Sequence, residues 1–326
     1  MVALRKTTFR EVPAPAARPD DHRVAVLIPC FNEAATISDV VRRFRAALPH
    51  ARIYVYDNNS RDGTSALARA SGAIVGVERR QGKGHVVRRM FADIEADCYL
   101  MVDGDGTYDP AAAAEAVDLV ARQGCDFVNI AREANAPDAY RRGHRFGNLA
   151  LTGMVRSFFG REVSDMLSGY KVFSRRFIKS FPALSGGFEI ETELTVHALE
   201  LRMAMAEISA PYKERPSGSA SKLRTFQDGA RILLLIARLV KDERPFPVFG
   251  ALGLALAIVG IVLGVPVVTT FLATGLVPRL PTAVLAVGFV GLGTLSLMTG
   301  IVLDVVTKAR QELKRLAYLA IPRKVI

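Results

Sequence analysis

Three short segments of the chain gather acidic and amide side chains directly after apolar runs: Pro29-Cys30-Phe31-Asn32-Glu33, the residues 57–64, and the residues 103–110. Asp103 and Asp105 are two residues apart, so in an extended or turn segment both can reach one ion. Mg²⁺ or Mn²⁺ held by one or two carboxylates can bridge to phosphate oxygens, which carboxylates alone repel. One Asp-Gly-Asp-Gly stretch is more often an ordinary turn, so the recurrence in three segments is what indicates a metal and phosphate site.

Apolar runs that alternate with helical stretches must position these segments. Strands are expected at 24–28, 53–56, 73–77, 99–102 and 127–130, and helices at 34–48, 64–71, 84–96 and 110–123. Repeated strand and helix with short connections is typical of an α/β domain with a mostly parallel sheet covered on both faces. Such folds bind ligands beyond the carboxyl ends of their strands, so the three segments are expected to meet at one rim.

The composition is basic, with 43 Lys and Arg against 32 Asp and Glu and a net charge of +11. This charge favours an anionic partner such as nucleic acid, anionic lipid or a phosphorylated ligand. Three cysteines, Cys30, Cys98 and Cys125, lie in or beside apolar runs and not in paired metal spacing, so we expect reduced thiols of a cytosolic domain. Residues 1–21 have no uninterrupted apolar core of a signal peptide and are expected to form a mobile tail.

Two long uncharged stretches, 245–278 and 280–303, lie near the C-terminus. A helix that crosses a bilayer needs about 20 apolar residues, so two transmembrane helices are predicted at about 249–272 and 282–303; a hairpin buried in a soluble core is the alternative. Cations flank the pair on both outer sides, whereas the loop between the helices holds only Arg279, which places both ends in the cytoplasm. Gly260 and Gly264 have a spacing that allows close approach of another helix, including one from a second copy.

These observations divide the chain into a tail (1–21), a cytoplasmic domain (22–224), a membrane-surface helix (225–244), a transmembrane hairpin (245–304) and a basic cytoplasmic tail (305–326). The segment 225–240 mixes leucines with arginines, as a helix on an anionic membrane surface does. A helix buried against the domain, with a basic edge, is the rival interpretation. The expected location is the plasma membrane, with several crossings.

The motifs of the domain resemble those of the family-2 inverting glycosyltransferases, which have a nucleotide-sugar-binding, Rossmann-like fold of the glycosyltransferase-A type. The resemblance covers about residues 22–225 and rests on 29–33, 57–64, Gly82-Lys83-Gly84, Asp103-Gly104-Asp105, Ser168-Gly169-Tyr170 and Phe188-Glu189. One departure is Asn58, where the family often has a second Asp. With two trailing membrane helices, the chain is most similar to the dolichyl- or undecaprenyl-phosphate sugar transferases.

The resemblance implies roles for the site residues. The donor side would comprise Pro29, Asn32, Glu33, Asp57, Lys83, Asp103 and Arg132, with Asp57 at the nucleobase and Glu33 near base or ribose. Asp103 and Asp105 would be the catalytic metal ligands, for Mg²⁺ or Mn²⁺. Asp62 is expected to cap the following helix instead. In the subfamily, arginines of this region contact the donor diphosphate or the acceptor phosphate. The candidates here are Arg132, Arg141, Arg142 and Arg145, and their individual roles stay open.

Glu189 and Glu191 match the place where relatives with hydroxyl acceptors keep a catalytic base. A lipid phosphate is already ionised at neutral pH, so these residues are expected to shape the acceptor side, with general base as a lesser alternative. The acceptor phosphate is expected to meet Arg145, Arg215, Ser219 and Lys222, the last three in a Gly/Ser-rich segment that could instead be a linker.

The predicted function is transfer of one sugar from a UDP- or GDP-sugar to a polyprenyl phosphate, with inversion and without nucleic acid as a partner. The alternatives are an idle membrane scaffold of the same fold and transfer to a hydroxyl acceptor. A processive synthase usually carries a Gln-x-x-Arg-Trp motif, and this chain has no Trp. A dinucleotide oxidoreductase needs Gly-x-Gly-x-x-Gly where residues 29–33 stand.

Overall fold

The computed structural model of the chain describes residues 23–134, 163–213 and 225–322, together with Gly153. Its strands are β1 (Val24–Cys30), β2 (Arg52–Asp57), β3 (Ile74–Val77), β4 (Cys98–Met101), β5 (Phe127–Ala134), β6 (Lys171–Ser174) and β7 (Met205–Tyr212). Its helices are α1 (Ile37–Ala47), α2 (Thr64–Ala70), α3 (Lys83–Asp93), the 3₁₀ turn η1 (Pro110–Ala112), α4 (Ala113–Ala121), α6 (Arg175–Ser180), α7 (Ile190–Glu200), α8 (Thr225–Glu243), α9 (Pro245–Thr274) and α10 (Leu280–Leu319).

Within the described residues the strands form one sheet of order β3-β2-β1-β4-β6-β5-β7. β6 is antiparallel to both of its neighbours, and the other pairs are parallel. All strands except β6 therefore run in one direction and end at the same rim of the sheet. The prediction of a mostly parallel sheet is confirmed, and the ends of β1, β2 and β4 come together as expected.

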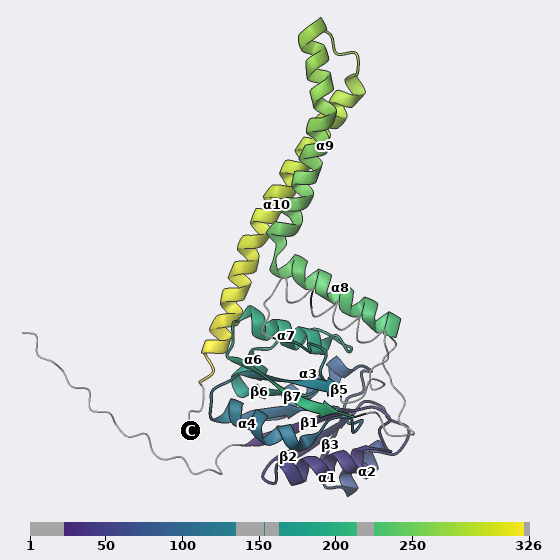
Figure 1. Cartoon of the computed structure of the whole chain (residues 1–326), viewed down its shortest axis with the longest axis vertical. Coiled ribbons are helices and arrows are strands. Elements are labelled where there is room, and N and C mark those ends of the chain that lie inside the picture. The colour runs from purple at the N-terminus through teal and green to yellow at the C-terminus, as the bar shows by residue number, and fades with distance from the viewer. Residues whose placement is uncertain (1–22, 135–152, 154–162, 214–224, 323–326) are drawn as a thin grey trace, which may run out of the picture.

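Helices cover both faces of this sheet (Figure 1). Side chains of β1 alternate between two apolar cores: Leu27 faces the core under α3, α6 and α7, and Val26 and Ile28 face the core under α1, α2 and α4. Because β1 lies inside the sheet and both of its faces are covered, its sequence is an almost continuous apolar run. The hydrophobic burial on the two faces fixes the register that carries the polar segments to the rim.

The four expected helices and five expected strands of the N-terminal half are present, with ends that differ by a few residues. β6 and β7 were not predicted. β6 has four residues and begins with the buried Lys171, so it lacks the apolar run of a central strand. β7 ends in Pro211-Tyr212, and proline ordinarily argues against a strand. A Pro is tolerated there because β7 is an edge strand.

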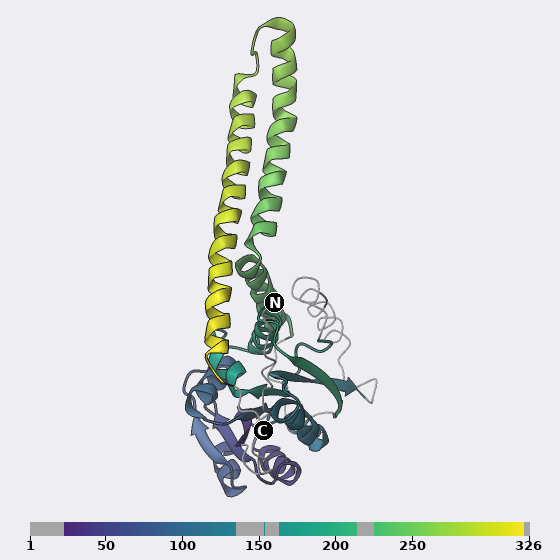
Figure 2. The same cartoon turned by 90° about the vertical axis from the view of Figure 1, so that its left-hand side faces the viewer.

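α9 and α10 form a long antiparallel hairpin that stands off the domain (Figure 2). Both helices are long and apolar enough to cross a membrane, with mean hydropathies of 2.7 and 1.9 in their most apolar windows. The buried residues of α10 recur every seven positions, at Ala286, Gly293, Gly300 and Thr307, which is the spacing of one continuous seam. A Cβ on Gly260 would lie 2.8 Å from the Ala286 carbonyl oxygen, so the partner helix that Gly260 approaches is α10 of the same chain.

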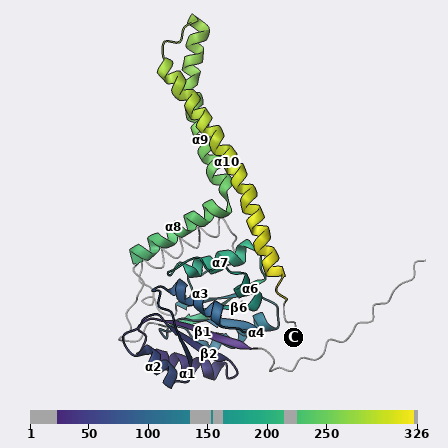
Figure 3. The same ribbon diagram turned by 180° about the vertical axis from the view of Figure 1, so that it is seen from behind.

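α8 lies between the hairpin and α7, as seen from behind in Figure 3. Leu239 and Val240 of α8 pack against Val196 and Leu199 of α7, whereas Leu233 and Leu234 are 45% and 69% exposed. Among its described side chains, α8 thus combines the two interpretations of this segment: one side packs on the domain and another exposes leucines.

α10 also continues beyond the boundary that the sequence suggested at residue 304. The helix runs without interruption to Leu319, and its last turns lie beside α6 (Figure 1). The segment expected as a basic tail is therefore, up to Leu319, a rigid extension of the second hairpin helix.

Candidate active site

The loop after β4 places Asp105 at the rim of the sheet. Asp105 is 3% exposed, and its Oδ1 accepts hydrogen bonds from the backbone N–H of Thr107 (3.1 Å) and from the Thr107 hydroxyl (2.6 Å). The loop is anchored to β7, because the Lys213 N–H donates to the Thr107 carbonyl (2.9 Å) and Tyr108 bridges to Tyr212. Asp105 is thereby held in one position before any ligand binds.

Hydrogen bonds tie the ends of β1 and β2 to each other. The Asn32 N–H donates to the Ser60 hydroxyl (2.8 Å), and the Asn32 side chain accepts from the Arg61 N–H (2.9 Å). Asp57, 7% exposed, accepts from the Ser60 N–H (2.9 Å) and the Ser65 hydroxyl (2.5 Å). Two of the expected donor-binding residues, Asn32 and Asp57, therefore also brace the loops that would contact the donor.

Glu33, Pro29 and Asp62 belong to the same rim. Glu33 and Pro29 are buried, and the Glu33 N–H donates to the Thr64 hydroxyl (2.9 Å). Asp62 accepts from the Thr64 N–H (3.1 Å) and from the Ala34 N–H (3.0 Å). Burial opposes ionisation of Asp62, but these hydrogen bonds and that of the Thr64 hydroxyl outweigh it and lower the pKa of the carboxyl. Asp62 thus binds the first N–H of α2 from the position before the N-cap, which is Gly63, so it braces the start of this helix without being its N-cap.

Asn58 connects the end of β2 to the loop before α3. Its amide donates to the carbonyls of Glu78 (2.9 Å) and Arg80 (2.7 Å), and its oxygen accepts from the Gly82 N–H (2.7 Å). An ionised Asp has no hydrogen to donate to two carbonyls. The departure from the family pattern at this position therefore matches the structure of the loop that carries Lys83.

The side chains of Lys83, Asp103 and Glu191 form one ionic cluster. The Lys83 ammonium contacts Asp103 Oδ1 and lies 2.5 Å from Glu191 Oε1, and the three side chains are 9%, 28% and 6% exposed. They come from the start of α3, the end of β4 and the first turn of α7. Lys83 therefore meets two carboxylates, and Glu191 is brought to the same rim as Asp103.

The surroundings of this cluster shift its pKa values. Burial opposes the charge of Lys83, but the adjacent Asp103 and Glu191 carboxylates outweigh it and raise the pKa of Lys83. Burial raises the pKa of Glu191 and is opposed by Lys83. Among the described residues, Glu191 Oε2 is buried and has no hydrogen-bond partner. Glu189, in contrast, is partly exposed and accepts from the Gly187 N–H (3.0 Å).

The two glycines that flank Lys83 allow a close contact between two backbone segments. A Cβ on Gly84 would lie 2.2 Å from the Ser185 carbonyl oxygen, and one on Gly82 would lie 2.2 Å from that of Gly186. The Gly82-Lys83-Gly84 segment thus packs directly on the loop that leads into α7. This contact, which the sequence pattern did not reveal, is what allows Lys83 to reach Glu191.

The residues present fit a divalent cation that is completed by a ligand. Among the described residues no three His, Cys, Asp or Glu side chains gather as a protein-only metal site would require, but Mg²⁺ in nucleotide sites is bound by one or two carboxylates plus phosphates and water. Asp105 and Asp103 both lie near Tyr212, whose pKa is raised by burial and by these two charges. A Cβ on Gly169 would lie 2.3 Å from Asp103 Oδ2, so the absence of a side chain there leaves room for this carboxylate.

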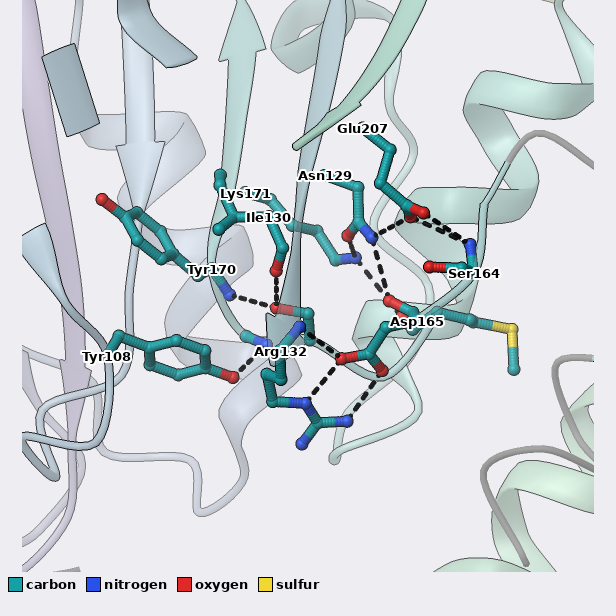
Figure 4. Close-up of polar contacts among 12 residues, drawn as sticks. Tyr108, Asn129, Ile130, Arg132, Ser164, Asp165, Tyr170, Lys171 and Glu207 are labelled. Carbon is teal, nitrogen blue, oxygen red and sulfur yellow. Dashed lines mark hydrogen bonds and ion pairs between the residues drawn. The ribbon is translucent and has the colours of Figure 1, made fainter. Parts of the chain in front are cut away.

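Arg132 is bound by a neighbouring carboxylate. Its guanidinium donates to Asp165 Oδ2 (2.6 Å) and Oδ1 (2.8 Å) in a two-pronged pair (Figure 4). Its Cζ also lies 5.5 Å from the centre of the Tyr212 ring. The structure places Arg132 at the end of β5 beside the loop of Asp105, where the Asp165 pair fixes its orientation.

Lys171 lies in the interior of the hydrogen-bond network that includes Arg132 and Asp165 (Figure 4). Its ammonium donates to the Asn129 side-chain oxygen (2.6 Å), and the Asn129 amide donates to Glu207 (2.7 Å). Burial lowers the pKa of Lys171 to about 8, opposed by Asp165, Glu191 and Glu207. Sequence reasoning missed Asp165, Lys171, Tyr108 and Tyr212; the quoted Ser168-Gly169-Tyr170 motif was the available signal, since the Gly169 N–H donates to the Tyr108 hydroxyl (2.8 Å).

The four residues predicted to bind the acceptor phosphate, Arg145, Arg215, Ser219 and Lys222, lie outside the described residues, as do Arg141 and Arg142. The described part of the chain brings together the predicted donor and metal residues at one rim, with Glu191 among them. It also places the start of α8 directly after the segment that holds Arg215 and Lys222.

Comparison with known proteins agrees with this arrangement. Residues 25–181 match the family described as Glycosyl transferase family 2. Glycosyltransferase AglJ of Haloferax volcanii is 33% identical over 301 residues, which span 91% of this chain and 98% of AglJ. The dolichyl-phosphate hexose transferase of the same organism is 25% identical over 68% of this chain and 95% of its own length.

Solved structures support the fold. Glucosyl-3-phosphoglycerate synthase from Mycobacterium tuberculosis, crystallised with Mn²⁺, UDP and phosphoglyceric acid, superposes with a TM-score of 0.55 at 24% identity and covers 68% of this chain and 78% of its own. The predicted fold class, a glycosyltransferase-A-type α/β domain followed by two apolar helices, is thereby confirmed. The chain belongs to glycosyltransferase family 2 and is an enzyme of that family.

Proposed function

We propose that this enzyme transfers a single sugar from a nucleoside-diphosphate sugar to a polyprenyl phosphate at the cytoplasmic face of a membrane. The observation that carries the proposal is the position of Asp103 and Asp105 at the rim of a domain from which two helices long enough to cross a bilayer emerge. The name of the Haloferax dolichyl-phosphate hexose transferase supports a lipid-phosphate acceptor. The Mn²⁺ and UDP bound by the glucosyl-3-phosphoglycerate synthase support a metal-dependent donor site.

Asp103 and Asp105 would hold Mg²⁺ or Mn²⁺. When bound, the cation neutralises the charge that develops on the leaving nucleoside diphosphate. Asp57, Glu33, Asn32 and Pro29 would line the nucleoside side of the rim. Because Asp57 and Asn32 are already fixed by hydrogen bonds, the donor would meet preorganised loops, which lowers the entropy cost of binding.

An oxygen of the acceptor phosphate attacks the anomeric carbon as the bond from this carbon to the diphosphate oxygen breaks. The electron pair leaves with the nucleoside diphosphate, and the configuration inverts. A phosphate monoester is largely ionised at neutral pH, so no base needs to take a proton. Lys83, held by Glu191 beside Asp103, would offset negative charge at the place where two phosphate-bearing substrates meet.

The orientation of the hairpin follows from its charges. Lys241 precedes α9 and Lys308 follows the apolar part of α10, so both outer ends would lie in the cytoplasm. The exposed Leu233 and Leu234 of α8 would enter the interfacial layer of the membrane. Arg215, Ser219 and Lys222, which immediately precede α8, would hold the acceptor phosphate at that height.

The test compares Asp105→Asn with Asp62→Asn in transfer of radiolabelled sugar from a panel of UDP- and GDP-sugars to undecaprenyl phosphate. Both aspartates accept from the N–H and hydroxyl of a Thr two residues later, so the amide oxygen of either variant can keep this turn while one charge is lost. Asp62→Asn also loses the bond from the Ala34 N–H, which makes it a stringent control. Asp105→Asn should lower transfer about a hundredfold or more, and Asp62→Asn should leave it within about threefold. Equal losses would reject Asp105 as the metal ligand.

One observation favours a second candidate, a hydroxyl acceptor with Glu191 as general base. The buried Glu191 Oε2 has no partner among the described residues, and burial raises the pKa of this carboxyl, as in carboxylates poised for proton transfer. Transfer to a hydroxyl-bearing lipid or to phosphoglyceric acid, with none to undecaprenyl phosphate, would favour this candidate.

A further inference from the structure

The last turns of α10 form a polar interface with the catalytic domain. We define residues 304–319 of α10 as the docking segment. At its upper end the Thr307 hydroxyl donates to the Asp242 carbonyl (3.0 Å), and the Arg310 guanidinium donates to the same carbonyl (2.8 Å). This carbonyl belongs to the last turn of α8, where helix carbonyls lack intrahelical partners and a cation is favourable. The docking segment therefore caps α8 at the corner where it turns into α9.

Two buried carboxylates meet Lys314 in the middle of the docking segment. The Lys314 ammonium lies 2.8 and 2.9 Å from the oxygens of Glu200, at the end of α7, and 3.3 Å from Glu243, at the end of α8. The side chains of Glu200 and Glu243 are each 5% exposed. One cation thus joins three helices. Its removal would leave the buried Glu200 without this cationic partner, which is unfavourable, whereas Glu243 would keep Arg310 at 2.7 Å.

A third contact lies one turn further along the docking segment. The Tyr318 hydroxyl donates to Asp126 Oδ2 (2.7 Å) and the Arg176 Cζ lies 4.6 Å from the Tyr318 ring centre. Asp126 is 1% exposed and directly precedes β5, the strand that carries Arg132. The docking segment therefore reaches the sheet itself.

α7 connects this interface with the candidate active site. It has 11 residues and is about 16 Å long; Glu191 in its first turn meets Lys83, and Glu200 at its end meets Lys314. Almost every side chain of α7 is buried, so the helix has no room to tilt by itself. Because α7 is packed into the domain along its length, a displacement of α10 at Glu200 would change the height and angle of the whole rim relative to the hairpin.

We propose that the docking segment is a positioning element that fixes the catalytic rim at one height and angle to the membrane hairpin, with Lys314 and Tyr318 as its positioning residues. The inference rests on the proposed function, because the fixed height matters only for an acceptor that is itself confined to the membrane. A phosphate on a long prenol cannot follow a tilted site out of the bilayer, whereas a short, water-soluble acceptor can. Misplacement by about 1 Å can cost a hundredfold in rate.

The experiment compares full-length wild type with Lys314→Met, and with Lys308→Met as the matched control. Lys308 lies on the same helix, is 68% exposed and, among the described residues, forms an ion pair within α10, with Asp304 (2.8 Å). Each protein is assayed with undecaprenyl phosphate in proteoliposomes and with geranyl phosphate in detergent. Lys314→Met should lower turnover of the long acceptor about tenfold or more, while its turnover of geranyl phosphate and its donor KM stay within about twofold. Lys308→Met should match wild type with both acceptors, and Lys314→Arg should restore most of the long-acceptor turnover.

Three results would contradict the inference, and each has a different meaning. Equal losses with both acceptors would mean that Lys314 supports folding and not position. Unchanged turnover of the long acceptor in Lys314→Met and in Tyr318→Phe would mean that the interface is not needed. If wild type transferred sugar to neither lipid phosphate, the proposed function itself would fail, and this role of the docking segment would fail with it.

Discussion

Two Asp-Gly-Thr turns, at 62–64 and 105–107, share two hydrogen bonds and have different surroundings. In each, the Thr N–H and hydroxyl donate to the Asp carboxylate two residues earlier. Asp62 is exposed and binds the first N–H of α2, whereas Asp105 is buried in the loop that follows β4, two residues after Asp103. The turn itself is therefore the same, although Asp62 also accepts from the Ala34 N–H. The place of the turn relative to the sheet separates a loop-bracing residue from a candidate metal ligand.

The ionic cluster of Lys83 gives a prediction at the same scale. Glu191→Gln keeps the shape of the side chain and an acceptor for Lys83 but removes one of the two negative charges beside this ammonium. Transfer to undecaprenyl phosphate should therefore fall about tenfold, equivalent to about 1.4 kcal/mol. Glu189→Gln is the comparison, because Glu189 is partly exposed and its carboxylate accepts from the Gly187 N–H, with no ion pair among the described residues. Transfer by this variant should stay within about threefold. The measurement is the steady-state transfer rate of each variant at saturating donor. A loss of about a thousandfold in Glu191→Gln would instead indicate a general base.

Sequence reasoning located Lys83, Asp103 and Glu191 individually, and the structure adds how they meet. Their contact depends on the approach of the Gly82-Lys83-Gly84 segment to the loop before α7, which are about a hundred residues apart in the chain. The pairing of Arg132 with Asp165 could not be predicted for the same reason, because the two residues are 33 positions apart in the chain. Motifs mark residue types and spacing along the chain, but they carry no information on such long-range pairs.

At the scale of elements, the alternation of apolar runs and helical stretches located β1 to β5 and α1 to α4. It failed at α7, where ten of eleven residues are buried and include Glu191, Glu193 and His197. A helix with polar residues on every side and all of them buried has no amphipathic period to detect. α10 shows the opposite case: hydropathy ends near Leu303 because the environment changes there, while the helix continues to Leu319.

The glycines of α9 predict how the hairpin is held together. Gly260→Ala should destabilise it, because the added Cβ would lie 2.7 Å from Val290 Cγ2 and 2.8 Å from the Ala286 carbonyl oxygen. Gly264→Ala is matched in sequence and helix propensity, but its Cβ would lie 3.6 Å from Ala286, an ordinary contact.

Thermal unfolding of the detergent-purified protein should show a lower apparent Tm for Gly260→Ala, by the equivalent of about 1–3 kcal/mol. The apparent Tm of Gly264→Ala should equal or exceed that of wild type. The reverse order would mean that the face of Gly264, and not that of Gly260, packs against another helix, as a homo-oligomer would require.

At the scale of the whole molecule, a single row of contacts runs from the membrane hairpin to the rim of the sheet. Lys314 of α10 meets Glu200, α7 spans the domain, and Glu191 meets Lys83 beside Asp103. The hairpin and the domain are therefore one mechanical unit within the described residues. His197 lies inside this unit, packed edge-on against Phe177 and Phe181.

The stability of this unit should depend on pH through His197. Burial, and next the charge of Lys314, lowers the pKa of His197 to about 3 from its ordinary value of 6.5, opposed by Glu243. Since the folded-state pKa is depressed, the unfolded chain binds the proton first as the pH falls below 6.5. The stability that neutral His197 contributes is thus present above pH 6.5 and is lost as the pH falls toward 3, by about 2 kcal/mol at pH 5.

The variant His197→Gln carries a neutral side chain at every pH, so its comparison with wild type isolates the contribution of His197 to the pH dependence of stability. The apparent Tm advantage of wild type over the variant should shrink by about 4–8 °C between pH 7 and pH 5. Glu200 acts in the opposite direction, because burial raises its pKa to about 7 against the effect of Lys314, so its contribution is lost as the pH rises from 4.5 to 7. That contribution is common to both proteins and cancels in the comparison. A Tm difference that stays constant from pH 7 to pH 5 would mean that His197 takes up its proton in the folded protein, and that the packing between α6, α7 and the docking segment opens to water.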